Sequence, residues 1–313
     1  MNNQYVPIAQ LFDKDLAPMA FHAVRLEDKL SLWKQGKAEG IGPGWKSLDD
    51  KVRFIGGELT TIAARPGQGK TAFAMQAADQ IAEQYRLTGD AGVVAVFSAE
   101  MTGWALAGRM AAGMSNTALH KLQMGKGTPE EYQRFEDAVA LLRTKQIWID
   151  DSSAPTTASM HRKIDELQKH VPVRAMLFDF LELGGDRGTG NEAQRISDIV
   201  LALKDIAKAL GIPVVALSQL NREVERRANK MPTLSDLRGS GQIEQSSDNV
   251  LFIMRPEYYI ERGDSVECKP DDREGVAIIN IAKNKNGPVG ITRLAWLGQQ
   301  MKFADLQRTE ITY

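Results

Sequence analysis

The segment that most constrains the fold is a glycine-rich loop, Ala64-Arg-Pro-Gly-Gln-Gly-Lys-Thr71, set between a β-branched run and a helix-favouring run. Its glycines let the backbone wrap closely around an anion, and the N–H groups at the start of the following helix point at that anion. This is the context that a phosphate-binding loop requires. We therefore expect a nucleotide site formed by Arg65, Pro66, Gly67, Gln68, Gly69, Lys70, Thr71 and Ala72.

Two residues of this loop carry most of the expected chemistry. Lys70 is placed to reach the β- and γ-phosphates and Thr71 to hold a magnesium ion, so ATP and Mg²⁺ are the expected ligands. The usual pattern begins with glycine, whereas this loop begins with Ala64. A glycine-rich turn that arises by chance is the alternative, and the flanking strand and helix patterns argue against it.

From residue 56 onward, apolar runs alternate with patterns typical of helices, which indicates an α/β fold. The expected helices are 70–85 and 192–210, and a capping box at 128–131 predicts the start of another. The expected strands are 58–64, 92–98, 173–179, 212–218, 248–254, 275–282 and 291–296. The last three strands have no helix between them. The pattern predicts a mostly parallel central sheet flanked by helices, with an antiparallel extension at its C-terminal end.

Residues 1–40 differ from the rest and are expected to form an arm with a helix, while residues 41–313 form the main domain. Leu26, Leu30 and Trp33 lie at helical spacing between residues 23 and 35, and a glycine-rich breaker follows at 40–44. The arm helix packs either on its own main domain or on a neighbouring subunit.

Composition excludes several classes of protein. The hydrophobic fraction of 43% and the charged fraction of 25% are those of an ordinary soluble domain. The single cysteine, Cys268, rules out an internal disulfide framework. We find no signal peptide and no apolar run of about 18 residues, so we expect a cytoplasmic protein without membrane contact. The net charge of −1 gives no global basic field, although local cations can still bind nucleic acid.

Polar residues follow three of the expected strands, at the edge of an open α/β sheet where ligand sites gather. Asp179 is placed to bind the magnesium shell, and Glu100 to orient and deprotonate an attacking water. Gln219 is placed to sense a γ-phosphate. The alternative for each is a solvated side chain at a strand end.

Five segments, in the same order, resemble the C-terminal motor domain of DnaB-type replicative helicases. They are 63–73, 97–101, 178–183, 216–222 and 234–245, and the resemblance covers residues 41–306. The stretches 218–222 (SQLNR) and 235–238 (SDLR) are far more specific than the phosphate loop, which many unrelated ATPases share. The resemblance implies a RecA-like fold and an ATP-hydrolysing helicase of DNA replication. It also implies movement 5′ to 3′ on single-stranded DNA, a hexameric ring and a helicase loader as partner.

The resemblance also implies roles for individual residues. Glu100 would be the catalytic base, Asp179 the magnesium-binding acid and Gln219 the link between the γ-phosphate and DNA. A loop containing Arg238, Gly239 and Gly241 would grip the DNA backbone, with a plain surface turn as the alternative. The loop 184–190 is a second candidate for DNA contact, or else a surface loop.

Two further segments resemble parts of the family's nucleotide site. In the hairpin 282–288, Lys283 and Lys285 would reach the ATP site of the neighbouring subunit, whereas Asn286-Gly287 by itself predicts only a tight turn. The segment 255–259 (RPEYY) resembles a stretch near the nucleotide base, and its aromatic residues are alternatively buried edge residues.

The sequence departs from the family at three points. Lys285 stands where the family usually has arginine, and lysine lacks the planar fork, so slower hydrolysis or a role shared with Lys283 is expected. Gly239 replaces an acid that is common there. Only about 40 residues precede the motor domain, so we expect the family's N-terminal domain to be absent, which leaves a primase partnership open.

Two other hypotheses compete with a translocating helicase. One is a RecA-like, DNA-dependent ATPase without unwinding activity, which the departures at 239 and 285 favour and the match at 234–245 opposes. The other is a non-hydrolysing loader or scaffold that binds a full-length helicase through its motor face.

Overall fold

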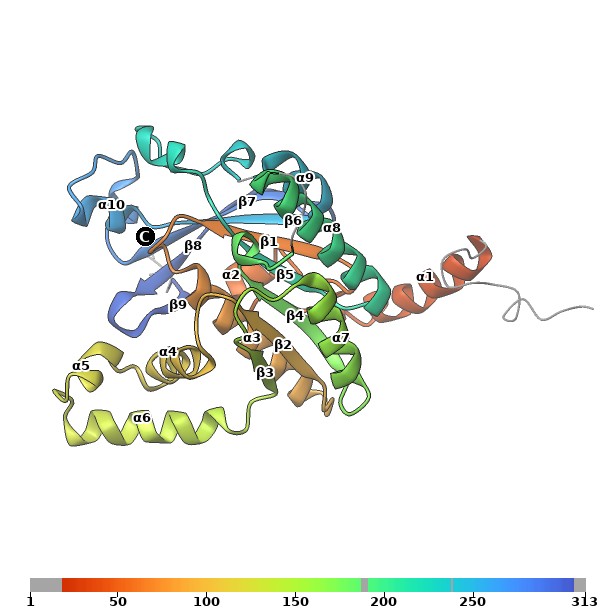
Figure 1. The fold of residues 1–313 in the computed structure, drawn as a ribbon, viewed down its shortest axis with the longest axis horizontal. Coiled ribbons are helices and arrows are strands. Elements are labelled where there is room, and N and C mark those ends of the chain that lie inside the picture. Colours follow the sequence, from red (N-terminus) through yellow and green to blue (C-terminus); the bar gives the residue numbers. More distant parts are fainter. Residues whose placement is uncertain (1–18, 187–190, 238, 307–313) are drawn as a thin grey trace, which may run out of the picture. The chain divides into compact units, whose positions relative to one another are not determined.

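The computed structural model describes residues 19–186, 191–237 and 239–306 (Figure 1). Arg238 and positions 187–190 of the second candidate DNA loop lie outside these residues. The chain divides into two units, residues 1–40 and 41–313. Helix α1 of the first unit spans Met19–Lys34, so it begins about one turn before the helix expected from position 23.

The second unit is built on one sheet of nine strands within the described residues, in the order β3-β2-β4-β5-β1-β6-β7-β8-β9. The first six strands of this order run parallel, and β7, β8 and β9 are antiparallel to their neighbours. The strands are β1 (Leu59–Ala64), β2 (Val93–Ser98), β3 (Ile147–Asp150), β4 (Val173–Asp179), β5 (Val214–Gln219), β6 (Asn249–Met254), β7 (Val276–Asn284), β8 (Gly290–Leu297) and β9 (Lys302–Asp305). This arrangement confirms the predicted fold class.

Helices cover both faces of the sheet, as Figure 1 shows. The α-helices are α2 (Lys46–Asp49), α3 (Lys70–Leu87), α4 (Gly103–Ser115), α5 (Leu119–Gln123), α6 (Pro129–Leu142), α7 (Thr157–Gln168), α8 (Glu192–Leu210), α9 (Ser240–Ser246) and α10 (Pro256–Glu261). Helix α3 packs on one face through an apolar stripe that includes Phe73 and Ile81. Helices α7, α8 and α9 pack on the other face.

Burial on both faces explains the composition of the central strand. All six residues of β1 are buried. Ile62 packs in the core on the α3 side, and Leu59 and Ala63 pack on the α8 side. No polar face is needed, so the strand reads as a continuous run of small and β-branched residues.

Several predicted boundaries agree closely with the structure. Helix α8 and strand β4 have the bounds expected from the sequence. Helix α6 begins with the capping box of Thr128 and Glu131. Strand β5 begins two residues later than expected and ends one later, at Gln219. Pro213 precedes it and lacks the N–H that a ladder position requires, which accounts for the later start.

A buried ion pair braces the sheet at the edge where β1 and β6 begin. Asp248 accepts a hydrogen bond from the backbone N–H of Leu59 at 2.9 Å and pairs with Lys204 of α8 and, at 3.2 Å, with Lys285. Burial by itself would raise the pKa of Asp248, but the bonds from these donors outweigh it and hold the pKa below its usual 3.8. The carboxylate therefore joins two strands, one helix and the β7–β8 hairpin.

We predict that Asp248→Asn lowers the free energy of unfolding by about 3 kcal/mol at pH 7, because it removes the ion-pair partner of the mostly buried Lys204. A depressed folded pKa gives stability that is present above pH 3.8 and lost as the pH falls through the folded value. The difference from the parent protein should therefore shrink in acid. Denaturant unfolding at several pH values measures it, with the half-exposed Asp165→Asn as control. A difference independent of pH would contradict the prediction.

Candidate nucleotide-binding site

The phosphate loop follows β1 and adopts a conformation that only glycine satisfies at two positions. Gly67 and Gly69 have φ values of 80° and 91°, in the left-handed region. A Cβ at position 67 would lie 2.6 Å from the Tyr258 ring, and one at position 69 would lie 2.9 Å from the Phe303 ring. Gly69 is the residue before α3, so the N–H groups of Lys70 and Thr71 open the helix beside the loop. This geometry suits an anion.

Side chains of the loop fasten it to the protein. Arg65 donates to the carboxylate of Glu225 at 2.9 Å and to the Leu220 carbonyl at 2.7 Å. The Gln68 side-chain oxygen accepts from the Arg255 N–H at 2.6 Å. The structure thus directs the Arg65 side chain to the end of β5, so Arg65 would contact a nucleotide through its backbone. The Gln68 oxygen is bound at the end of β6, which leaves the Nε2 of this side chain for a ligand.

Several buried donors near the loop have no acceptor among the described residues. They are the Gln68 Nε2, the Arg255 Nε and the Trp296 Nε1. The Arg255 guanidinium also stacks on the Trp296 ring at 4.3 Å and donates to the Gly67 carbonyl at 2.9 Å. Buried donors without acceptors are costly in a folded protein and fit a site completed by an anionic or polar ligand.

Lys70 is half-buried and faces three acids. Loss of hydration lowers the pKa of its amine, and the charges of Asp179, Glu182 and Glu100 oppose that shift. The ammonium group also lies 4.2 Å from the centre of the Phe180 ring. A lysine in these surroundings is poised to exchange its acidic neighbours for the phosphates of a nucleotide.

Thr71 and Asp179 fit a magnesium ion. The Thr71 hydroxyl donates to the Asp179 Oδ2 at 2.7 Å, and the Asp179 Oδ1 is buried with no hydrogen-bond partner among the described residues. Burial raises the pKa of Asp179, while Lys70 and the Thr71 hydroxyl lower it in part. A hydroxyl beside an unsatisfied carboxylate oxygen supplies the hard oxygen ligands that Mg²⁺ takes.

The other predicted polar residues lie on neighbouring strand ends. Glu100 follows β2 and is exposed, and Ala99 next to it donates from its N–H to the Asp179 carbonyl at 2.7 Å. Gln219 ends β5, which pairs with β1 so that Gln219 lies opposite Ala64. The sheet therefore brings the loop, both acids and the amide to one edge.

Sequence analysis did not single out Glu182. This residue is 8% exposed, and its Oε1 accepts from the Ser218 hydroxyl and the Gln219 N–H, both at 2.8 Å. Its Oε2 has no partner among the described residues, and burial raises the pKa of the carboxyl. An acid within the apolar stretch 178–183 was the only sequence signal.

The predicted lysine pair lies at the opposite edge of the sheet. Lys283 pairs with Val250 across β7 and β6, and Val250 lies opposite Thr61, three residues before the end of β1. The three residues from Thr61 to the end of β1 alone span about 10 Å. The Lys283 amine donates to the Glu244 carbonyl at 2.6 Å, and Lys285 pairs with Asp248. These lysines are not brought to the phosphate loop of their own chain.

The candidate DNA-contact loops are described in part. Gly239 adopts a left-handed φ of 68° and precedes α9, and Gly241 is exposed with open space around its Cα. In the second candidate loop, the Asp186 carboxylate accepts from the N–H and hydroxyl of Thr157, the first residue of α7. Asp186 thus serves a helix start.

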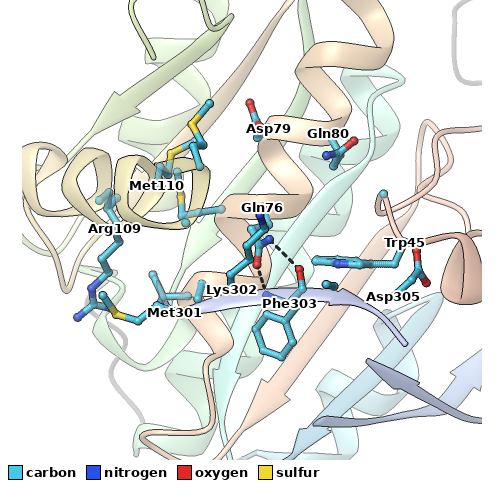
Figure 2. Close-up of a pocket in the computed structure, with 18 residues that line it drawn as sticks. Trp45, Gln76, Asp79, Gln80, Arg109, Met110, Met301, Lys302, Phe303 and Asp305 are labelled. Atoms are coloured by element: carbon cyan, nitrogen blue, oxygen red, sulfur yellow. Dashed lines mark hydrogen bonds between the residues drawn. The ribbon is translucent and has the colours of Figure 1, made fainter. Parts of the chain in front are cut away.

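A cavity of about 350 Å³ lies beside the first turns of α3, between α3, α4 and the residues 301–305 that include β9 (Figure 2). Gln76 closes one wall by exchanging two hydrogen bonds with the backbone of Phe303. Trp45, which is buried, stacks on Phe73 at 4.4 Å. The antiparallel extension is thereby fixed to the helix that begins at the phosphate loop.

We predict that Glu182→Gln is more stable than the parent protein, by a margin that grows as the pH rises from 5 to 8. A carboxyl with a raised folded pKa contributes stability that is present below its ordinary value of 4.5 and lost as the pH rises through the folded value. Glutamine keeps the acceptor for Ser218 and Gln219 but cannot ionise. Thermal unfolding across this pH range measures the difference, with the exposed Glu166→Gln as control. Parallel pH profiles for Glu182→Gln and the parent would refute it.

Comparison with known proteins places this site in a family. Residues 40–305 match the DnaB-like helicase C-terminal domain. The chain is 36% identical over 278 residues to the replicative DNA helicase DnaB of Geobacillus stearothermophilus and, with the same figures, to DnaC of Bacillus subtilis. Each alignment covers 88% of this chain and 58% of the relative, so the chain spans less than two thirds of their length.

Solved structures give the same result. The ATPase domain of G40P aligns with 95% of this chain and 100% of its own length, at 27% identity and a TM-score of 0.83. A DnaB-like replicative helicase, solved in a study of its interactions with primase, aligns with 90% of this chain and 66% of its own length, at 28% identity and a TM-score of 0.80. None of the helices in the described residues is long and apolar enough to cross a membrane. By sequence and fold, the chain belongs to the DnaB-like helicase C-terminal domain family.

Proposed function

We propose that this chain is the ATP-hydrolysing motor of a replicative DNA helicase, which moves 5′ to 3′ along single-stranded DNA as a hexameric ring. The observation that carries the proposal is the edge of the sheet where Lys70, the Thr71–Asp179 pair, Glu100 and Gln219 come together. The match to the helicase family over nearly the whole chain supports it.

In this proposal, the residues at the strand ends have separate roles in ATP hydrolysis. Glu100 accepts a proton from a water molecule as the water oxygen attacks the γ-phosphorus, and the bond to the bridging oxygen of ADP breaks. Lys70 leaves its acidic neighbours and neutralises charge on the phosphates. Thr71 and Asp179 would hold a magnesium ion, which would offset phosphate charge. The exposure of Glu100 gives water access to it.

The lysines of the β7–β8 hairpin complete the site of a neighbouring subunit. They lie at the far edge of the sheet from their own phosphate loop, so they can serve an ATP site only in trans. Their charge would stabilise the phosphoryl group during transfer. The same chain thus presents a phosphate loop at one edge and a basic hairpin at the other, as a ring requires.

DNA contact is assigned to the start of α9. Gly239 and Gly241 permit close approach of a phosphate to the backbone, and Arg238 supplies a charge between Leu237 and Gly239 in the sequence. Gln219, at the end of β5, links the γ-phosphate to this segment in our proposal.

We predict that Lys70→Ala lowers kcat/KM for ATP by about 100-fold or more, since it removes charge stabilisation of the transferring phosphate. The parent protein should hydrolyse ATP faster when single-stranded DNA is present. Steady-state phosphate release with and without an oligonucleotide measures both effects. Normal turnover by Lys70→Ala would overturn the site, and turnover indifferent to DNA would favour an ATPase that does not translocate.

A mixing experiment tests the action in trans. Lys70→Ala and Lys285→Ala subunits should each be slow alone, and mixed rings should recover part of the turnover. The reason is that some interfaces then join an intact phosphate loop to an intact hairpin. Phosphate release is measured after subunits are mixed at several ratios, with subunit exchange verified independently. No recovery in exchanged rings would contradict the assignment of Lys285 to a neighbouring site.

A further inference from the structure

The segment that leaves β5 is held on one side by the phosphate loop. The Leu220 N–H donates to the Ala64 carbonyl at 3.2 Å, and the Arg65 guanidinium donates to the Leu220 carbonyl at 2.7 Å. Arg65 also pairs with Glu225, five residues farther along, at 2.9 Å. The backbone of this segment and one of its carboxylates are therefore fixed to the loop that would cradle the phosphates.

The other side of the same segment contacts residues 236 and 237, at the end of a short 3-10 helix, Leu234–Asp236. Leu220 forms an antiparallel bridge with Leu237, and the Asn221 N–H donates to the Asp236 carbonyl at 2.8 Å. Asp236 is 5% exposed and pairs with Arg227 at 2.6 Å. One short segment thus contacts the phosphate loop through Arg65 and the approach to α9 through Leu237.

The burial and anchoring of the Arg65–Glu225 pair allow it to transmit a movement of the phosphate loop. The Arg65 side chain is 7% exposed and that of Glu225 is 30% exposed, so solvent screens the pair only in part. The buried Lys230 amine donates to the Glu225 carbonyl at 2.6 Å and fixes the backbone that carries the carboxylate. A movement of the phosphate loop would therefore reach the segment 220–227 without being absorbed by a mobile side chain.

We infer that the Arg65–Glu225 ion pair couples nucleotide binding to DNA binding, with Glu225 as a positioning residue that touches neither ligand. The inference rests on the proposed function, and it adds a second connection to the one assigned to Gln219. When a phosphate displaces the loop, Arg65 moves with it and pulls Glu225 and the segment 220–227 along. The contacts of that segment with Asp236 and Leu237, made through Arg227 and Leu220, pass the movement to the approach of α9. The DNA-contact loop starts at the residue after Leu237.

Glu225→Gln tests this inference, because it keeps the shape of the side chain and removes the charge that holds Arg65. The chain offers a matched control, Glu223→Gln, two residues away. Glu223 pairs with Arg226 on the surface, where both side chains are more than two-thirds exposed (67% and 77%). Circular dichroism and thermal unfolding verify that both variants fold.

The measurement is a binding cycle on the oligomeric protein. The affinity for a fluorescent, non-hydrolysable ATP analogue is determined with and without a thymidine oligonucleotide. The affinity for the oligonucleotide is determined with and without the analogue. Linkage requires that the two ratios be equal, which gives one coupling factor.

We expect the coupling factor of Glu225→Gln to fall by about fivefold or more, toward one, while each ligand binds alone as in the parent. A residue with a merely structural role would weaken the separate affinities instead. Glu223→Gln should keep the parental factor. A parental factor in Glu225→Gln, or loss of either separate affinity, overturns the inference and leaves the proposed function standing. A parent protein without any coupling would overturn the proposed function itself.

Discussion

The parallel pairing of β1 with β5 and β6 is the constraint on which the site depends. Because neighbouring parallel strands end at the same edge, residues far apart in the sequence meet there. Ala64, Gln219 and Ile253 are register partners, and the phosphate loop begins directly after them. The loop is then fixed by Leu220 on the β5 side and by Arg255 on the β6 side. A change in either neighbouring strand would therefore alter the phosphate site.

Unsatisfied polar atoms mark where this edge is incomplete. Near this edge, buried donors without acceptors among the described residues lie at Gln68, Arg255 and Trp296, and buried acceptors without donors there lie at Asp179 and Glu182. The donors suit phosphates or a base, and the Asp179 oxygen suits a cation. Ligands that satisfy these atoms would stabilise the folded protein by linkage. The Lys70 amine interacts with the acids Asp179, Glu182 and Glu100. The phosphates of a bound nucleotide would compete with these acids for its positive charge.

Sequence patterns predicted the structural features that depend on a single stretch of chain. The helical period of 192–210 and the apolar run of 173–179 gave the bounds of α8 and β4, because burial decides both. Strand β3 has four partly exposed residues, so its pattern is weak. The loop Lys70–Thr71 and Asp179 could be placed together from the rule that strand ends meet. Glu182 could not, because its importance comes from bonds to Ser218 and Gln219 that no local signal contains. Arg65 shows the same limit, since its partner Glu225 is 160 residues away.

In the proposed function the two edges of the sheet have different tasks, which favours an assembly over a lone ATPase. Within their own chain, the Lys283 amine donates to the Glu244 carbonyl and Lys285 pairs with Asp248. Glu244 lies in α9, the helix that begins at the proposed DNA loop. The Lys283 amine thus connects the helix proposed to contact DNA with the hairpin proposed to serve a neighbouring ATP site. Force from DNA on α9 would then act on a neighbouring ATP site, while the Arg65–Glu225 pair acts within the chain.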